Sequence, residues 1–152
     1  MTALTNTMEN RMIDHLLRGQ SLVVGSSTST WSAAPDISVA LYTVAPTDST
    51  AGTEVTGGSY ARVTVASSLA NWSGTQGAGT TAASSGTSGE ISNNAAVTFP
   101  VPTANWGTAA AAGLLDSAGV LLSWAALGAP ITILLGDPAP EFPAGSLKFK
   151  LD

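Results

Sequence analysis

Alternation of apolar and polar residues with a period of two is the feature that most constrains how this chain can fold. It is clearest over residues 90–99, where Ile91, Val97 and Phe99 fall on one face of an extended chain and Ser92 on the other. Since successive side chains of a strand point to opposite faces, this pattern predicts a β-strand. The same alternation predicts strands over residues 37–44, 60–66 and 146–152.

Three apolar segments extend the strand pattern. Residues 109–115 predict a strand; an alanine-rich helix over 108–115 is the competing interpretation, and Gly113 argues against it. Residues 120–127 are apolar on both faces apart from one serine, which predicts a central strand covered on both sides. Gly-Ala-Pro at 128–130 predicts a turn before a further strand at 131–135.

These segments amount to about seven short strands separated by turn signals, preceded by one N-terminal helix. The pattern is typical of a mainly β protein with an antiparallel, β-sandwich-like domain. We therefore expect residues 1–20 to form a helical arm and residues 21–152 a single β domain. Residues 21–36, which include Trp31, predict an extended segment or a loop.

The helix is predicted over residues 6–18. Asn6 and Glu9 have the spacing of a capping box, and Gly19 is a stop signal. Asp14 and Arg18 form a favourable i,i+4 pair.

An apolar stripe runs along this helix with a spacing of four residues. A helix this short is marginal in water, so the stripe must pack on another surface, either the chain's own sheet or a neighbouring subunit. The stripe is made of Met8, Met12 and Leu16.

Residues 53–62, TEVTGGSYAR, combine a glycine turn with the start of a strand. Arg62 is a charge in an otherwise neutral strand. It predicts either a partner carboxylate, for which Glu54 is the nearest candidate, or a subunit contact, or a plain solvent-facing arginine. Tyr60 falls on the same face of the strand. The candidate interface residues are therefore Met8, Met12, Leu16, Tyr60 and Arg62.

Residues 74–89 hold no large apolar side chain and consist mostly of glycine, serine, threonine and alanine. Such a composition predicts a flexible or loosely ordered surface loop. A loop this long inside a compact domain is usually functional or disordered. A neighbouring molecule could order it.

Charged residues make up only 10% of the chain, which carries a net charge of −5 with five cations. Five scattered cations do not form the basic stripe that nucleic-acid binding requires. No apolar run reaches the length of a membrane span, and the N-terminus lacks the apolar region of a signal peptide. A neutral surface suits a protein packed against other copies or other proteins, or a secreted adhesive domain.

The sequence shows no catalytic apparatus. It contains no cysteine and one histidine, and His15 follows Asp14 directly on the helix, where adjacent side chains diverge by about 100°. A single histidine cannot form a histidine metal cluster. Asp137 and Glu141 lie in a proline-rich loop and give only a weak calcium signal, while Asp116 is best explained as a turn former. We expect no catalytic, metal or cofactor site, and a protein that is not an enzyme.

Several stretches resemble a family of small tailed-phage virion proteins that are often labelled tail-fibre proteins. Besides TEVTGGSYAR at 53–62, these are ENRMIDHLL at 9–17, VALYTVAPTD at 39–48, NAAVTFP at 94–100 with ANWG at 104–107, and AGSL at 144–147. Residues 74–89 and the alanines at 109–112 depart from the pattern.

The resemblance implies a structural part of a virion, assembled in the host cytoplasm, that forms homo-oligomers and contacts the major capsid protein or tail proteins of the same particle. The small size and the lack of a repetitive shaft favour a capsid decoration, or cement, protein that stabilises the head. The alternative is a tail or tail-fibre component that acts in tail assembly or host adsorption. A third hypothesis is a carbohydrate-binding or hydrolytic domain that uses the chain's tryptophans: Trp31, Trp72, Trp106 and Trp124.

Overall fold

The structure, a computed structural model, describes residues 4–22 and 35–151, so Trp31 and most of the predicted segment at 21–36 lie outside the described residues. The chain divides into two compact units. Unit 1 comprises Met1–Asp36, Ala66–Val97 and Phe142–Asp152, and unit 2 comprises Ile37–Val65 and Thr98–Glu141. The predicted arm at 1–20 and single β domain at 21–152 stay predictions, and the two units are described separately below.

Unit 1 begins with helix α1 (Asn6–Leu17). The N-cap is Thr5, whose Oγ1 accepts the N–H of Met8 at 3.4 Å. The predicted N-cap, Asn6, is instead the first residue of the helix. Ile13 and Leu17 are the apolar residues of α1 that are fully buried. The stripe of Met8, Met12 and Leu16 is only half-buried.

Two short strands complete the regular structure of unit 1. Strand β4 (Glu90–Ser92) pairs antiparallel with β9 (Lys148–Lys150), with Ile91 opposite Phe149. Lys148 Nζ lies 2.8 Å from Glu90 Oε1, which closes the pair with an exposed ion pair. The C-terminal strand with outward lysines was predicted, and the structure confirms it over Lys148–Lys150.

The strand predicted over residues 90–99 is interrupted at Asn93. This side chain is 1% exposed, and its Nδ2 donates to the carbonyls of Ala95 and Pro143 at 2.8 and 2.9 Å. Its Oδ1 accepts the N–H of Leu147 at 2.9 Å. Asn93 therefore bridges two chain segments, and pairing resumes only in β5 (Val97–Thr98). Both β5 and β8 (Glu141–Phe142) lie where the chain passes between the units.

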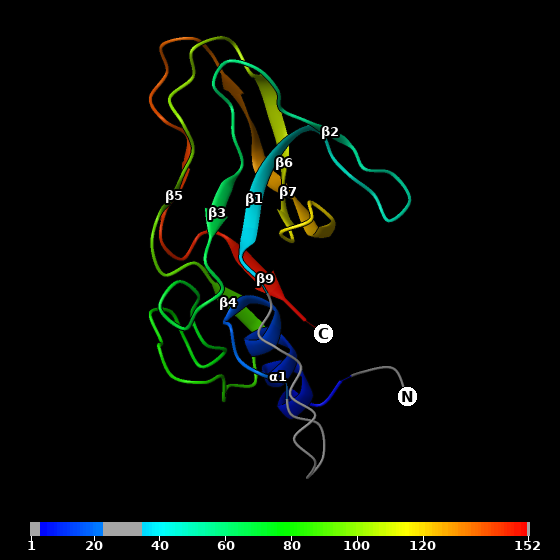
Figure 1. The fold of residues 1–152 in the computed structure, drawn as a ribbon, viewed down its shortest axis with the longest axis vertical. Helices are drawn as coiled ribbons and strands as arrows, with labels where there is room; N and C mark the ends of the chain where they lie inside the picture. Colours follow the sequence, from blue (N-terminus) through cyan, green and yellow to red (C-terminus); the bar gives the residue numbers. More distant parts are fainter. Residues whose placement is uncertain (1–3, 23–34, 152) are drawn as a thin grey trace. The chain divides into compact units, whose positions relative to one another are not determined.

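Unit 2 is built on an antiparallel sheet (Figure 1). Its path runs β2 (Thr53–Glu54), β1 (Ile37–Val44), β6 (Gly107–Leu115) and β7 (Leu121–Ile133), and β3 (Val63–Val65) also pairs with β1. For the described residues, these strands and the single N-terminal helix confirm the predicted mainly β, antiparallel fold.

The centre of this sheet is β1 and β6. Ala40, Tyr42, Ala111 and Leu115 form a buried cluster, with Leu121 packed against it. The helical alternative for the alanine-rich segment is wrong, because these small residues pair in register with β1, for example Ala112 with Leu41. Small side chains suit a strand that lies between two others and is covered on both faces.

The prediction of a buried central strand at 120–127 is wrong. Strand β7 is the last in the order, and most of its residues are exposed. The predicted turn at 128–130 is also absent as a chain reversal. The register passes from Ala109 opposite Ile131 to Ala111 opposite Ala126, so residues 127–130 bulge within one long strand.

Candidate functional site

The glycine turn at residues 53–62 holds a compact polar cluster in unit 2. Arg62 binds Glu54 through two hydrogen bonds, from Nε to Oε1 at 2.9 Å and from Nη2 to Oε2 at 2.7 Å. The Tyr60 hydroxyl donates to the same Oε1 at 3.0 Å and accepts the backbone N–H of Leu41 at 2.9 Å. Glu54 is thus the partner of Arg62, as one of the sequence alternatives predicted.

This geometry shifts the ionisation of each member. The hydrogen bond from Arg62, helped by that from Tyr60, lowers the pKa of Glu54 below its ordinary value of 4.5, although partial burial opposes the shift. The pKa of Arg62 is raised, first of all by its bond to Glu54. Burial raises the pKa of Tyr60. The cluster is therefore a fixed ion pair with a neutral phenol, and it contains no group poised to exchange a proton near neutrality.

Aromatic side chains pack together next to the glycine turn and support it. The Tyr60 ring stacks on Phe99 with centroids 6.2 Å apart and meets Trp106 edge-on at 5.2 Å. Trp106 Nε1 donates to the carbonyl of Gly58 at 2.8 Å. Gly58 has a φ of 54°, and a Cβ there would lie 2.8 Å from Trp106 Nε1, so only glycine fits this turn.

A second polar cluster lies in unit 1, where α1 meets the glycine-rich loop at 74–89. Arg18 is completely buried and pairs with Asp14, with Nη1 and Oδ1 2.7 Å apart. Its Nη2 donates to the carbonyls of Thr80 and Ala82 at 3.1 and 2.7 Å. Asp14 accepts both the N–H and the hydroxyl of Ser84, at 2.8 and 2.6 Å.

Asn10 continues this contact one helical turn earlier. Its Nδ2 donates to the carbonyl of Gly86 at 3.0 Å, and its Oδ1 accepts the Thr75 hydroxyl at 2.6 Å. We call Asn10, Asp14 and Arg18 the polar clamp. Sequence reasoning identified the Asp14–Arg18 pair but not its loop partners, because their contribution comes mainly from backbone groups.

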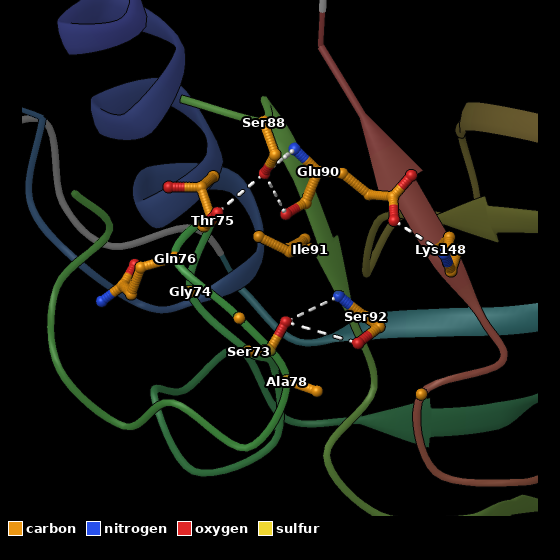
Figure 2. Close-up of a pocket in the computed structure, with 12 residues that line it drawn as sticks. Ser73, Gly74, Thr75, Gln76, Ala78, Ser88, Glu90, Ile91, Ser92 and Lys148 are labelled. Atoms are coloured by element: carbon orange, nitrogen blue, oxygen red, sulfur yellow. Dashed lines mark hydrogen bonds and ion pairs between the residues drawn. The ribbon is translucent and has the colours of Figure 1, made fainter. Parts of the chain in front are cut away.

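A cavity of about 440 Å³ opens beside the same loop (Figure 2). Its walls are loop residues and the β4–β9 pair, and its lining is rich in hydroxyls. These hydroxyls already bond within the unit: Ser73 Oγ accepts the N–H of Ser92 at 2.9 Å, and Ser88 Oγ donates to the carbonyl of Thr75 at 2.7 Å. The lining contains no histidine, so the cavity offers no nucleophile with an adjacent imidazole base.

The structure brings two of the five candidate interface residues together and leaves the other three elsewhere. Tyr60 and Arg62 share the cluster around Glu54. Met8, Met12 and Leu16 lie on α1 in unit 1. A role of these residues in an interface remains a prediction.

The remaining candidate residues are accounted for by local structure. His15 Nδ1 lies 3.1 Å from the carbonyl oxygen of Gln20. Asp116 Oδ1 accepts the N–H groups of Ala118 and Val120 at 2.9 and 2.8 Å, which confirms it as a turn former. Asp137 accepts the N–H of Leu134 at 2.7 Å.

The described residues lack two further features. Within residues 4–22 and 35–151, no group of three or more histidine, aspartate or glutamate side chains could hold a metal ion. The described part of the chain has no helix with the length and apolar character to cross a bilayer.

The tryptophans differ in exposure. Trp72 and Trp106 are 0% and 4% exposed, so neither ring face is open to a sugar. Trp124 on β7 is 38% exposed. The proposed platform of four tryptophans is therefore not formed by the three that the structure describes.

The feature that sequence reasoning missed is the apolar surface of β7. Leu122, Trp124 and Ile131 are 44%, 38% and 56% exposed, and Val120 just before the strand is 58% exposed. The signal was present in the sequence as an apolar segment without charge, but such a segment also describes a buried strand. Only the position of β7 at the end of the strand order distinguishes the two.

The comparison with known families places the chain in a class of proteins. A family model of phage fibre proteins matches residues 3–150, which makes this a structural component of a phage virion. The chain belongs to the family described as Podophage GP4 fiber I protein gp80. Neither a curated protein nor a solved structure matches it. The family match confirms the resemblance to tailed-phage virion proteins drawn from the sequence.

Proposed function

We propose that this chain is a component of a tail fibre and takes part in tail assembly or host adsorption. The observation that carries the proposal is the family match, which extends over residues 3–150 and whose description names a fibre protein. The expectation of a capsid decoration protein rested on small size and on the lack of a repetitive shaft. The family description supports the fibre alternative better than it supports the head.

We further propose that the role is structural and not enzymatic. The polar groups of the described residues support this, because they are engaged in holding the chain together. Glu54 is bound by Arg62 and Tyr60, and Asp14 by Arg18 and Ser84. The hydroxyls of the cavity bond to neighbours within unit 1.

The proposed partners are other copies of the chain and other tail proteins of the same virion. The low content of charged residues supports packing against protein, and a net charge of −5 gives no attraction for nucleic acid. The exposed apolar residues of β7 supply a surface of the kind that interfaces use.

Labelling of intact particles tests the location. Gold-labelled antibodies raised against the purified chain should bind at the tail of negatively stained virions. Label spread over the head would overturn the proposal and favour the decoration hypothesis.

Adsorption tests the role. Purified protein, added in excess to host cells before infection, should lower the adsorption rate if the chain is the part of the fibre that contacts the host. Unchanged adsorption together with tail labelling would assign the chain to assembly of the fibre and not to host contact.

A further inference from the structure

In unit 2, the outer edge of β7 is the part of the sheet to which a further strand could best be added. One edge of β7 pairs with β6, and its other edge has no partner strand within the described residues. Its thirteen residues make it the longest strand of the sheet. Long, apolar edge strands expose unpaired N–H and C=O groups, and proteins usually shorten, charge or cover them.

The sequence around β7 contains none of the charges that would keep another strand away. Residues 117–136 include no aspartate, glutamate, lysine or arginine, whereas β9 in unit 1 carries Lys148 and Lys150 on its exposed side. Strand β9 therefore carries charges of the kind that oppose pairing at an edge, and β7 carries none. This contrast indicates that the β7 edge favours pairing with a further strand.

We infer that β7 pairs with the β7 strand of a second copy of this chain, in antiparallel orientation across a two-fold axis. An antiparallel self-pairing places each strand opposite its own sequence, so its cost depends on whether like charges meet. With no charge over residues 117–136, none meet. A charged partner would instead leave its charges without counter-charges at this edge.

The size of the surface is consistent with a weak but specific dimer. A thirteen-residue strand is about 43 Å long, and a strip about 10 Å wide along it covers on the order of 400 Å² in each copy. Val120, Leu134 and Leu135 are also exposed and extend the strip at both ends. The two copies together would bury about 1,000 Å², the lower limit for a specific interface.

Full overlap of the two copies of β7 places the two-fold axis at the bulge, with residues 121–126 of one copy opposite residues 128–133 of the other. Residues 127–130 form the bulge against β6, and Pro130 has no N–H to donate. The regular part, Leu121 to Ala126, includes the exposed Leu122 and Trp124. Backbone hydrogen bonds would form along this part, and Ile131 of each copy would lie opposite Ser123 of the other, beside its exposed Leu122 and Trp124.

This inference deepens the proposed function by naming the surface through which copies associate, and the two can fail separately. Location in the particle tests the function, whereas the solution mass of the purified full chain tests the surface. Light scattering after size exclusion, over a dilution series, should show a concentration-dependent change from monomer to dimer.

Two charge substitutions make the test specific. Ile131→Lys should raise the dimer dissociation constant at least tenfold, because two lysines would lie in an apolar contact. Val101→Lys is the matched control, since Val101 is 58% exposed, close to the 56% of Ile131, and lies outside β7 in the same unit. It should leave the dissociation constant unchanged. Equal effects of both variants would overturn the inference.

Hydrogen exchange on the unmodified chain gives a result that does not depend on a variant folding. Amides of residues 121–126 should exchange more slowly at high than at low protein concentration, while those of β4 and β9 should not change. A chain that is monomeric at every concentration, or a dimer whose protection falls outside β7, would contradict the proposal. A dimer that forms only with another tail protein present would contradict it as well.

Discussion

The two units contrast in how they treat the polar and apolar parts of the sequence. Unit 1 contains the most polar and glycine-rich segment, residues 74–89, and holds it with the polar clamp on α1. Unit 2 contains the most apolar segment, β7, and leaves much of it exposed at the end of the sheet. Composition alone would have predicted the opposite, a mobile polar loop and a buried apolar strand.

The contrast shows that a segment is held in place when its hydrogen-bonding groups have partners within the chain. Its hydrophobicity matters less. The loop lacks large apolar side chains, yet its carbonyls and hydroxyls find charged partners in Arg18 and Asp14. Strand β7 has many apolar side chains, but one of its edges has no partner in the described chain. A segment with unmet bonding groups and apolar surface is where a second molecule would bind.

The largest effect is expected from Arg18→Met. The side chain is 0% exposed and its guanidinium serves the carbonyls of Trp72, Thr80 and Ala82 and the carboxylate of Asp14. Removing one partner of a buried ion pair costs about 3–5 kcal/mol. Urea unfolding followed by circular dichroism should show this loss.

A control and a local readout sharpen this prediction. Arg11→Met, at an exposed position on the same helix, should change stability by no more than about 1 kcal/mol, the upper range for an exposed charge. Hydrogen exchange in the Arg18 variant should rise over residues 74–89 before it rises in β1 and β6. An equal rise in hydrogen exchange in both units would contradict the difference between them.

The next largest effect concerns the glycine turn of unit 2. In Gly58→Val the new side chain would collide with Trp106 and with the carbonyl of Ala104, in addition to the strain of a positive φ, for a loss of about 2–4 kcal/mol. Gly57→Val is the matched control, because Gly57 has a φ of 76° but no neighbouring atom within 4 Å of a Cβ. If both variants lose the same stability, the collision with Trp106 is unimportant.

A smaller effect is expected from pH. Because Arg62 and Tyr60 lower the pKa of Glu54 in the folded state, the carboxylate favours folding at pH values above 4.5, and this contribution is lost as pH falls through the lowered value. In Glu54→Gln, stability should depend less on pH below about 5, with a loss at neutral pH of no more than about 1 kcal/mol for a partly exposed pair. Thermal unfolding at several pH values measures it. A steeper acid dependence in the variant would contradict the assignment.

The smallest effect on folding is expected from Arg62→Ala. Its side chain is 38% exposed and its partner lies in the same unit, so the loss should stay below about 1 kcal/mol. If Arg62 also contacts a partner subunit, as the sequence suggested, assembly into particles should fall more than stability does. Equal losses of monomer stability and incorporation would remove that interface role.

Sequence reasoning predicted the elements with clear periodicity. Helix α1, the strand Ile37–Val44 and the terminal strand around Lys148 were all expected, because alternation and helical spacing report which faces are covered. The pairing of Arg62 with Glu54 was one of three alternatives drawn from the sequence, and the glycine turn brings the two segments together. These are local features, and local sequence determines them.

The predictions that were wrong or incomplete share one physical cause, which is contact between segments that are distant in sequence. The strand at 90–99 is divided because the side-chain amide of Asn93 donates hydrogen bonds to the carbonyls of Phe142 and Pro143, which are distant in sequence. The position of β7 at an edge depends on strand order, which periodicity does not contain. The clamp on residues 74–89 depends mainly on backbone groups, which every sequence has, and its two hydroxyl partners, Thr75 and Ser84, are not distinguished from the other serines and threonines of the loop.

The most direct test of the account is the copy number and position of the chain in the intact virion. Quantitative mass spectrometry against the major capsid protein, combined with a cryo-electron microscopy map, would measure both. A fibre component should occur in a small symmetric set, on the order of a dozen copies or a few dozen, with its density at the tail. Hundreds of copies spread over the head would contradict the fibre assignment and establish the chain as a decoration protein.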